Sequence, residues 1–301
     1  DGFFLRDVAI KECGQESQMN ENRMELVNLK GRATLIVDGR FVDVEDRSNK
    51  AFSSEHNALF ARWPDFFRWA RGEMAEPSDL IADPRELGPC VPRPPQVFAI
   101  GLNYRAHARE SGQEIPAEPM VFTKFPSCLS GPRADIRLTS DTCDWETELV
   151  VVIGPGGRSI PERNALGHVA GFCVGQDISD RRLQFSGSMP QFSLGKSAPG
   201  FGPVGPAVVP LENLASPLDL ALRCDINGER VQDARTNDMI FSVPTLIAYL
   251  SSKCALQPGD LIFTGTPSGV GSVRDPRRYL RPGDLIESEI EGVGVLGNRC
   301  L

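Results

Sequence analysis

The sequence predicts a mixed, β-rich α/β fold, in which a small N-terminal α+β domain precedes a larger β-rich domain. Three observations support this prediction. After residue 95, short β-branched runs recur between Gly- and Pro-rich turns, few long helical patterns interrupt them, and a proline-rich stretch separates them from the N-terminal part. This pattern favours strands of mixed direction, whereas a doubly wound sheet needs a helix between successive strands.

The N-terminal part carries signals for a hairpin and a helix. Residues 1 to about 30 are polar and weakly patterned, so we expect little structure there. Asp38-Gly39 separates two apolar runs, which is a strong signal for a β-hairpin. A short aromatic helix is predicted over 64–70, with Gly72 placed to end it.

A domain boundary is predicted in the proline-rich stretch from Glu76 to Pro95. Proline fixes φ and cannot donate a backbone hydrogen bond, so several prolines interrupt both helices and strand pairing. We therefore assign residues 1–93 to the small N-terminal domain and residues 94–301 to the larger domain.

The sequence of the larger domain predicts strands joined by tight turns. One clear helix is expected from Pro244 through Leu250, where apolar residues recur at helical spacing. Two Pro-Gly turns, at 258–259 and 282–283, are each expected to lead into a strand. Strands are predicted over the apolar runs 97–100, 149–153, 169–174, 220–226 and 261–263.

Composition and charge exclude several classes of function. The net charge of −8 argues against binding to nucleic acid or to an anionic membrane surface. The longest apolar run, 149–153, is far too short to span a bilayer, so no membrane segment is expected. The eight cysteines are scattered and never spaced Cys-x-x-Cys, which predicts reduced, buried thiols and a cytoplasmic protein.

Three acidic residues form a candidate metal site. A strand is predicted over 144–154, so Glu146 and Glu148 would project from the same side, with Cβ atoms roughly 7 Å apart. Two carboxylates so close repel each other unless a cation lies between them or one is protonated. Asp177 follows another apolar run and could join them. Spacing alone leaves two interpretations open, a site for a hard cation and an exposed, charged strand edge.

His107 and Glu110 form a candidate catalytic pair. They lie three residues apart in a short helix predicted over 101–110, so they share one face and can form a hydrogen bond. A carboxylate next to an imidazole fixes its tautomer and suits it to act as a general base. An ordinary surface pair has the same spacing, and this interpretation also stays open. His56 and His168 have no such partner and are interpreted as structural.

Lys196 lies in a long Gly- and Pro-rich stretch, within Gly195-Lys196-Ser197. A lysine among small residues can approach a ligand closely and can balance an oxyanion. The triplet is also typical of a nucleotide-binding loop, but Pro190 stands where that loop needs its first glycine. We therefore exclude a nucleotide loop and keep Lys196 as a candidate active-site cation.

Several motifs follow one another along the larger domain. They are Gly-Leu-Asn-Tyr at 101–104 with His107 and Glu110, Glu-Thr-Glu-Leu at 146–149, Gln-Asp-Ile-Ser at 176–179 with Arg181 and Gln184, Leu-Gly-Lys-Ser at 194–197, Met-Ile-Phe-Ser at 239–242 and Thr-Gly-Thr-Pro at 264–267. In this order they resemble the fumarylacetoacetate hydrolase family, over roughly residues 95–298. Within it, the resemblance is to the branch of acylpyruvate hydrolases and 2-hydroxyhepta-2,4-diene-1,7-dioate isomerases.

The resemblance implies a β-roll catalytic domain, a homodimer and a role for each candidate residue. It implies that Mg²⁺ or Mn²⁺ is bound by Glu146, Glu148 and Asp177. It also implies that His107 and Glu110 activate water and that Lys196 is the active-site lysine. Substrate contacts are implied for Tyr104, Arg181, Gln184 and Thr266.

The predicted activity is metal-dependent hydrolysis of a C–C bond in an acylpyruvate-like (2,4-diketo) acid, through a metal-stabilised enolate. The substrate is then a small anionic 2-oxo or diketo acid. A family match does not fix the reaction. The alternative is an isomerase, tautomerase or decarboxylase of a 2-oxo dioic acid on the same site, and a further one is a non-catalytic sensor of a 2-oxo acid or a metal.

Overall fold

The computed structural model describes residues 23–37, 40–72 and 83–301. The strands are β1 (Met24–Leu29), β2 (Arg32–Val37), β3 (Arg40–Asp43), β4 (Val97–Gly101), β5 (Met120–Thr123), β6 (Leu129–Ser130), β7 (Cys143–Asp144), β8 (Thr147–Ile153), β9 (Val169–Gln176), β10 (Ser179–Asp180), β11 (Gly202–Val209), β12 (Ala221–Ile226), β13 (Glu229–Arg235), β14 (Leu261–Phe263), β15 (Leu285–Ile290) and β16 (Gly294–Arg299). The α-helices are α1 (Val44–Arg47), α2 (His56–Ala61), α3 (Trp63–Gly72), α4 (Arg105–Glu110), α5 (Arg181–Gln184), α6 (Phe192–Gly195) and α7 (Val243–Lys253). Short 3-10 helices are η1 (Pro84–Glu86), η2 (Pro126–Cys128), η3 (Glu162–His168), η4 (Leu211–Asn213), η5 (Thr236–Asp238) and η6 (Gly271–Val273).

A ten-stranded sheet forms the centre of the molecule. Its main path runs β3-β2-β1-β11-β9-β8-β14-β4-β5, and β6 pairs with β11 beside this path. A second sheet has the order β13-β12-β15-β16, and β10 pairs with β7. Most neighbours are antiparallel, but β14 pairs with β4 and β11 with β6 in parallel, as expected for strands of mixed direction.

Strand β8 is buried on both faces, which explains its uninterrupted apolar sequence. Leu149, Val151 and Ile153 pack in a core that also holds side chains of β12, β15 and β16. Val150 and Val152 alternate with them and pack in a second core, with side chains of β1, α2 and α3. β8 therefore packs against the second sheet on one face and against N-terminal elements on the other.

The N-terminal part contains one strand that the sequence analysis missed. We expected little structure before residue 30, and this was wrong for 24–29, which form β1. Polar Glu25 and Asn28 obscure its alternation, yet β1 pairs with β2 over its whole length and meets β11 at Leu26 and Val208. The earlier residues of that range, 1–22, lie outside the described part of the chain. The domain division after residue 93 stays a prediction. β1, from the N-terminal part, and β11, from the larger part, belong to the same sheet.

Several local predictions agree with the structure. β2 and β3 pair as a hairpin with Val37 opposite Arg40, while its Asp38-Gly39 turn lies outside the described residues. The aromatic helix is α3, and the second expected helix is α7. Both Pro-Gly turns precede strands, and their glycines adopt positive φ, +85° at Gly259 and +94° at Gly283.

Two predicted elements differ in extent. The strand expected over 144–154 is divided, since β7 ends at Asp144 and β8 begins at Thr147. The helix expected over 101–110 begins only at Arg105, because Leu102 takes a positive φ of 53° and Tyr104 is extended. Both interruptions lie next to the candidate site.

The described cysteines and helices bear on two further expectations. The cysteines at 90, 128, 143, 173, 224, 254 and 300 are unpaired, and all but Cys254 are buried. Within the described ranges, no helix has both the length and the apolar character needed to cross a bilayer.

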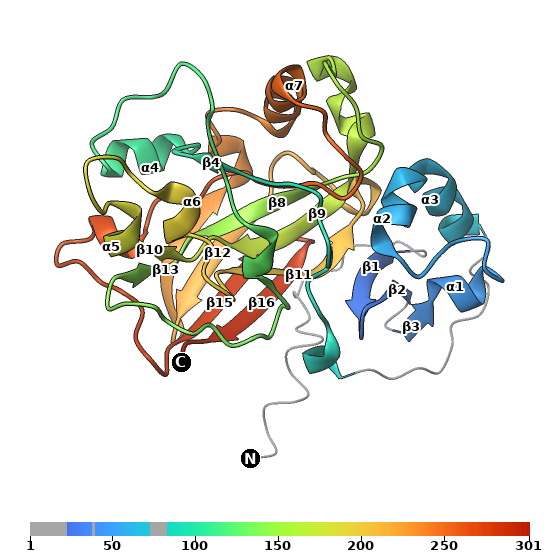
Figure 1. The fold of residues 1–301 in the computed structure, drawn as a ribbon, viewed down its shortest axis with the longest axis horizontal. Helices are drawn as coiled ribbons and strands as arrows, with labels where there is room; N and C mark the ends of the chain where they lie inside the picture. The colour runs from blue at the N-terminus through green and yellow to red at the C-terminus, as the bar shows by residue number, and fades with distance from the viewer. Residues whose placement is uncertain (1–22, 38–39, 73–82) are drawn as a thin grey trace.

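In Figure 1, β1–β3 and α1–α3, in blue, form one end of the molecule, and α4, α5 and α6 lie toward the other end.

Candidate metal and active site

The three predicted metal ligands converge in a buried position. β8 and β9 pair so that Thr147 lies opposite Gln176, which brings the following Asp177 next to Glu146. The backbone amide of Asp177 donates to the carbonyl oxygen of Glu146 at 2.9 Å. One carboxylate oxygen from each of Glu146, Glu148 and Asp177 lies within 4.8 Å of the others. Their exposures are 7%, 1% and 0%, which excludes the exposed strand edge.

Lys196 lies against two of these carboxylates. Its Nζ donates to Glu146 Oε2 at 2.8 Å and to Asp177 Oδ2 at 2.6 Å. Burial alone would raise the pKa of Glu146, but the positive charges of Lys196 and Arg181 outweigh it and lower this pKa to about 2. Burial would likewise lower the pKa of Lys196, whereas Asp177 and Glu146 raise it above its ordinary value. Both groups are therefore charged at neutral pH.

Glu148 has a different environment from its two neighbours. Its Oε2 accepts a hydrogen bond from the amide of Gly265 at 2.8 Å, and no ion pair to it is found among the described residues. Burial, and then the charges of Asp177 and Glu146, raise the pKa of Glu148 well above its ordinary value. A cation between the three carboxylates would remove this repulsion.

The donor set and the charge balance fit a hard divalent cation. All three side chains offer carboxylate oxygens, which Mg²⁺ and Mn²⁺ prefer. Counted with the neighbouring Asp144, four buried carboxylates face two buried lysines, Lys124 and Lys196, and the partly buried Arg181. Such buried charges need compensation, and a bound cation would supply it.

Arg181 and Gln184 lie on α5, at the edge of this cluster. Asp180 caps α5 by accepting from the amides of Arg182 and Leu183. Arg181 forms ion pairs with Glu146 at 2.6 Å and Asp144 at 2.7 Å, and its Nη1 donates to Gln184 Oε1 at 2.9 Å. Two of the four predicted substrate-contacting residues, Arg181 and Gln184, therefore touch each other, and Arg181 also touches the predicted metal ligand Glu146.

His107 and Glu110 form a hydrogen-bonded pair on α4. The distance from His107 Nδ1 to Glu110 Oε1 is 2.7 Å, and the amide of Gly269 holds both oxygens of Glu110 at 3.0 Å. The side chains are 14% and 25% exposed, so the pair is partly accessible and the catalytic role stays a prediction. An electrostatic interaction with His107 is the last and smallest of the causes that lower the pKa of Glu146. The pair therefore borders the carboxylate cluster.

Tyr104 and Thr266 lie in the protein interior. The hydroxyl of Tyr104 is fully buried and has no hydrogen-bond partner within the described part of the chain. Burial, with the nearby charge of Glu148, raises the pKa of this hydroxyl. Thr266 Oγ1 donates to the carbonyl of Thr147 at 2.9 Å and accepts from Gln232 at 2.8 Å. Its hydroxyl proton is used internally, so its predicted contact with substrate stays a prediction.

Two buried residues of the cluster were not found from the sequence. Lys124 is fully enclosed, and its Nζ donates to Asp177 Oδ1 at 2.7 Å and to the backbone carbonyls of Lys196 and Phe201. Asp144 is fully buried beside Arg181. The one available signal was a charged residue next to an apolar run, which is too common to be diagnostic.

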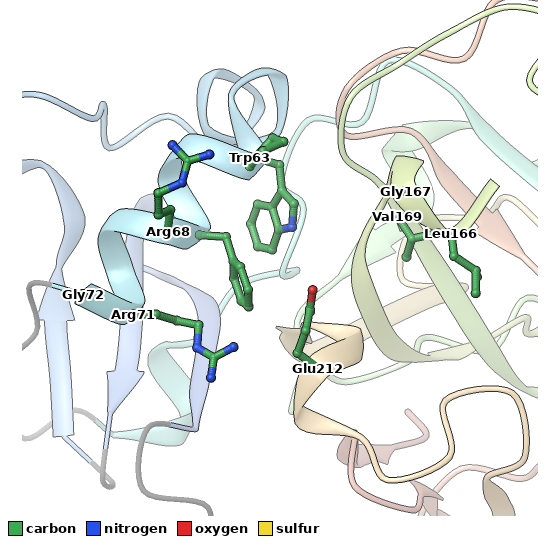
Figure 2. Close-up of a pocket in the computed structure, with 10 residues that line it drawn as sticks. Trp63, Arg68, Arg71, Gly72, Leu166, Gly167, Val169 and Glu212 are labelled. Carbon is green, nitrogen blue, oxygen red and sulfur yellow. The ribbon is translucent and has the colours of Figure 1, made fainter. Parts of the chain in front are cut away.

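A prominent cavity lies away from this chemistry. It has a volume of about 530 Å³ and lies between α3 on one side and residues 166–169 and Glu212 on the other. Figure 2 shows Trp63, Arg68 and Arg71 on one side and Glu212 on the other. None of the predicted site residues lines it, so we place the functional site at the carboxylate cluster.

Comparison with known proteins identifies the family. The family model for the C-terminal part of fumarylacetoacetate (FAA) hydrolase matches residues 96–301. The chain belongs to the fumarylacetoacetate hydrolase family. This confirms the resemblance drawn from the motifs.

Relatives within the family carry different activities in their names. The chain is 44% identical over 213 residues to "Oxaloacetate tautomerase FAHD2B, mitochondrial" of Bos taurus, covering 70% of this chain and 68% of that protein. A Mycobacterium smegmatis structure described as an HpcE protein is 48% identical, with a TM-score of 0.88, covering 92% and 99% of the two chains. A fumarylpyruvate hydrolase of Pseudomonas aeruginosa, solved with Mn²⁺ and pyruvate, is 32% identical, with a TM-score of 0.63, covering 72% and 92%. These matches confirm the β-rich α/β fold and show an enzyme family of hydrolases and isomerases.

Proposed function

We propose that the protein is a divalent-metal-dependent tautomerase, which interconverts the keto and enol forms of a small 2-oxo dioic acid such as oxaloacetate. One observation carries the proposal: three buried carboxylates, a buried lysine and a histidine–glutamate pair meet in one place. Such a site can bind a small acid and move a proton next to its carbonyl group. The relative at 44% identity, whose name states this reaction, supports the choice over hydrolysis.

Glu146, Glu148 and Asp177 would hold Mg²⁺ or Mn²⁺, and the related fumarylpyruvate hydrolase was solved with Mn²⁺. When bound, the ion would supply a Lewis acid next to the 2-oxo group. The chain's own residues would do the rest. Lys196 and Arg181 offer positive charge to the anionic substrate, in a net acidic protein that would otherwise repel it.

The His107–Glu110 pair would move the proton. The neutral imidazole takes a proton from C3 of the 2-oxo acid, and the electrons of that C–H bond form the C2–C3 double bond of the enol. His107 then returns the proton to the 2-oxo oxygen, so nothing is gained or lost overall. Glu110, fixed by the amide of Gly269, keeps Nδ1 protonated and leaves Nε2 free to act as the base.

A second candidate is hydrolysis of an acylpyruvate, the activity expected first from the sequence. The same His107–Glu110 pair can activate water, and the fumarylpyruvate hydrolase shares the fold. Here His107 takes a proton from water, and the resulting hydroxide attacks the distal carbonyl. The C–C bond then breaks, its electrons forming the enolate of a 2-oxo acid, and the other product is a carboxylic acid. The proton held by His107 goes to the enolate carbon, which gives the 2-oxo acid. Decarboxylation of a 2-oxo dioic acid is the third reaction that this site could support.

Three assays on one preparation separate these reactions. Loss of enol absorbance tests oxaloacetate tautomerisation, loss of the diketo chromophore tests acylpyruvate cleavage, and CO₂ release tests decarboxylation. We expect tautomerisation far above the spontaneous rate, and its loss in His107→Asn but not in the control Asp141→Asn, whose carboxylate is exposed. Acylpyruvate cleavage alone would favour the second candidate, and tautomerisation at the same rate in His107→Asn would refute the role of the pair.

The remaining expectations belong to the same proposal. The substrate would be a small anionic acid, and the homodimer implied by the family stays a prediction that light scattering checks. The cytoplasmic location also stays a prediction, since the names of the related tautomerases place those proteins in mitochondria.

A further inference from the structure

One loop supplies backbone amides to three acidic side chains of the site. The loop spans 264–278 and follows β14. The amide of Gly265 donates to Glu148 at 2.8 Å, and that of Gly269 holds both oxygens of Glu110 at 3.0 Å. The amides of Gly271 and Ser272 donate to Asp144, at 2.7 and 3.0 Å. The position of this loop therefore affects both the metal ligands and the catalytic pair.

Asp144 joins this loop to the other side of the site. Its Oδ1 accepts from Gly271 and from the amide of Trp145, and its Oδ2 accepts from Ser272 and twice from Arg181, at 2.9 and 2.7 Å. Arg181 in turn contacts Glu146 at 2.6 Å. A fully buried carboxylate is tolerated only where its hydrogen bonds are made, so these contacts restrain one another.

A second attachment lies beside the first. The indole Nε1 of Trp145 donates to the carbonyl of Gly269 at 3.2 Å. Arg274 and Arg278 of the same loop segment lie over the Trp145 ring, with their guanidinium carbons 5.6 and 5.7 Å from its centre. Asp144 and Trp145, the two residues just before Glu146, thus hold the loop at both Gly269 and Gly271.

We infer that Asp144 is a positioning residue, which fixes the 264–278 loop against Arg181 and thereby holds Glu110 in register with His107 and the metal ligands. This inference rests on the proposed function, because it assigns a purpose to the alignment of the pair with the carboxylates. Asp144 is not one of the three candidate metal ligands. Its effect passes through Arg181 to Glu146 and through Gly269 to Glu110.

The test compares Asp144→Asn with the control Asp141→Asn. Both replace an aspartate of the same segment with its amide, but Asp141 is exposed and pairs with Arg182 at the surface. In Asp144→Asn one oxygen becomes an NH₂ group, which cannot accept from the loop amides or from Arg181. Hydrogen exchange of the loop and imidazole ¹⁵N spectra of His107 are measured on the metal-free proteins, and turnover on the metal-loaded ones. The chain has three histidines, so the imidazole signals can be assigned.

We expect Asp144→Asn to exchange the amides of Gly269, Gly271 and Ser272 at least tenfold faster. We also expect it to lose the signature of an Nδ1 proton donated to Glu110, and to lower kcat at least tenfold with a smaller change in KM. Asp141→Asn should match the wild type in all three measurements. A loosened loop with an unchanged His107 spectrum would overturn the inference, as would an unchanged loop.

A second variant, in case Asp144→Asn does not fold, disturbs the contact between Asp144 and Gly271 by changing the loop residue. In Gly271→Ala the added Cβ would lie 1.8 Å from the Arg278 carbonyl oxygen and 2.8 Å from Asp144 Oδ1, so the loop must move while Asp144 remains. The same changes in exchange and in the His107 spectrum are expected, and their absence would overturn the inference. Both readouts are independent of turnover, so a failure of the proposed reaction can be told apart from a failure of this coupling.

Discussion

At the scale of single residues, the site is a set of buried charges that compensate one another incompletely. Glu146 and Asp177 share Lys196, while the hydrogen bond that Glu148 accepts within the described ranges comes from a backbone amide. This asymmetry explains why the pKa of Glu146 falls and that of Glu148 rises, although the two side chains lie two residues apart. A site with these properties is poised to take up a cation.

Lys196→Ala should separate catalysis from metal binding. Removing one group that stabilises a developing oxyanion typically costs about 10²–10³ in turnover, and we expect a loss of this size. Mn²⁺ affinity should be kept or increased, because the three carboxylates lose a competing positive charge. Calorimetric titration with Mn²⁺ and steady-state kinetics check both parts. The exposed Lys253→Ala is the control, and near-normal turnover in Lys196→Ala would remove the lysine from the mechanism.

At the scale of elements, β8 unites the fold with the site. Its apolar residues contribute to two cores. Glu148 is its second residue, and Glu146 directly precedes it in the chain. The β8–β9 register also places Asp177. A strand buried on both faces is hard to displace, which suits a site that depends on fixed carboxylates.

Val151→Ala should destabilise the protein by about 2–3 kcal/mol, since it removes two buried methyl groups and leaves a cavity. The same substitution in edge strand β5, Val121→Ala, should cost well under 1 kcal/mol, because Val121 is 38% exposed. Urea unfolding of both variants measures the difference. Equal costs at the two positions would show that β8 is not the central support described here.

Helix α2 is joined to β1 through His56, which should make stability depend on pH. The Nε2 of His56 donates to the carbonyl of Val27 at 3.2 Å, and burial lowers the pKa of His56 to about 4. In the unfolded chain this pKa is near 6.5, so the unfolded state binds more protons between pH 6.5 and 4. The stabilisation from neutral His56 is therefore complete above pH 6.5 and is lost as the pH falls toward 4, by about 1.4 kcal/mol per pH unit.

His56→Gln removes this titration. Its free energy of unfolding, measured in urea at pH 7, 6 and 5, should fall less steeply with decreasing pH than that of the wild type. Comparing the two proteins cancels the opposite contribution of Asp260, whose pKa is raised to about 6 by burial. Parallel pH profiles for the two proteins would contradict the assignment of His56 as a buried neutral base.

At the scale of the whole molecule, sequence reasoning identified local features better than distant pairings. The Asp-Gly hairpin, α3, α7 and the Pro-Gly turns depend on neighbouring residues and were predicted. The pairing of β1 with β11 was not, because Leu26 and Val208 meet across most of the chain. The same reason hid Lys124, whose partners Asp177 and Lys196 lie 53 and 72 residues away. The metal ligands could be proposed because Glu146 and Glu148 are close in sequence and Asp177 follows an apolar run, and the ordered motifs then supported all three.

The central claim is that the three buried carboxylates hold a divalent cation that the reaction requires. The most direct test is turnover of oxaloacetate after dialysis against EDTA, before and after Mn²⁺ or Mg²⁺ is restored, in the wild type and in Glu148→Gln. We expect the dialysed wild type to be inactive and to recover with either ion, while Glu148→Gln stays at least 100-fold below it at the same metal concentration. Full turnover in the dialysed protein, or a Glu148→Gln variant as active as the wild type, would contradict the account.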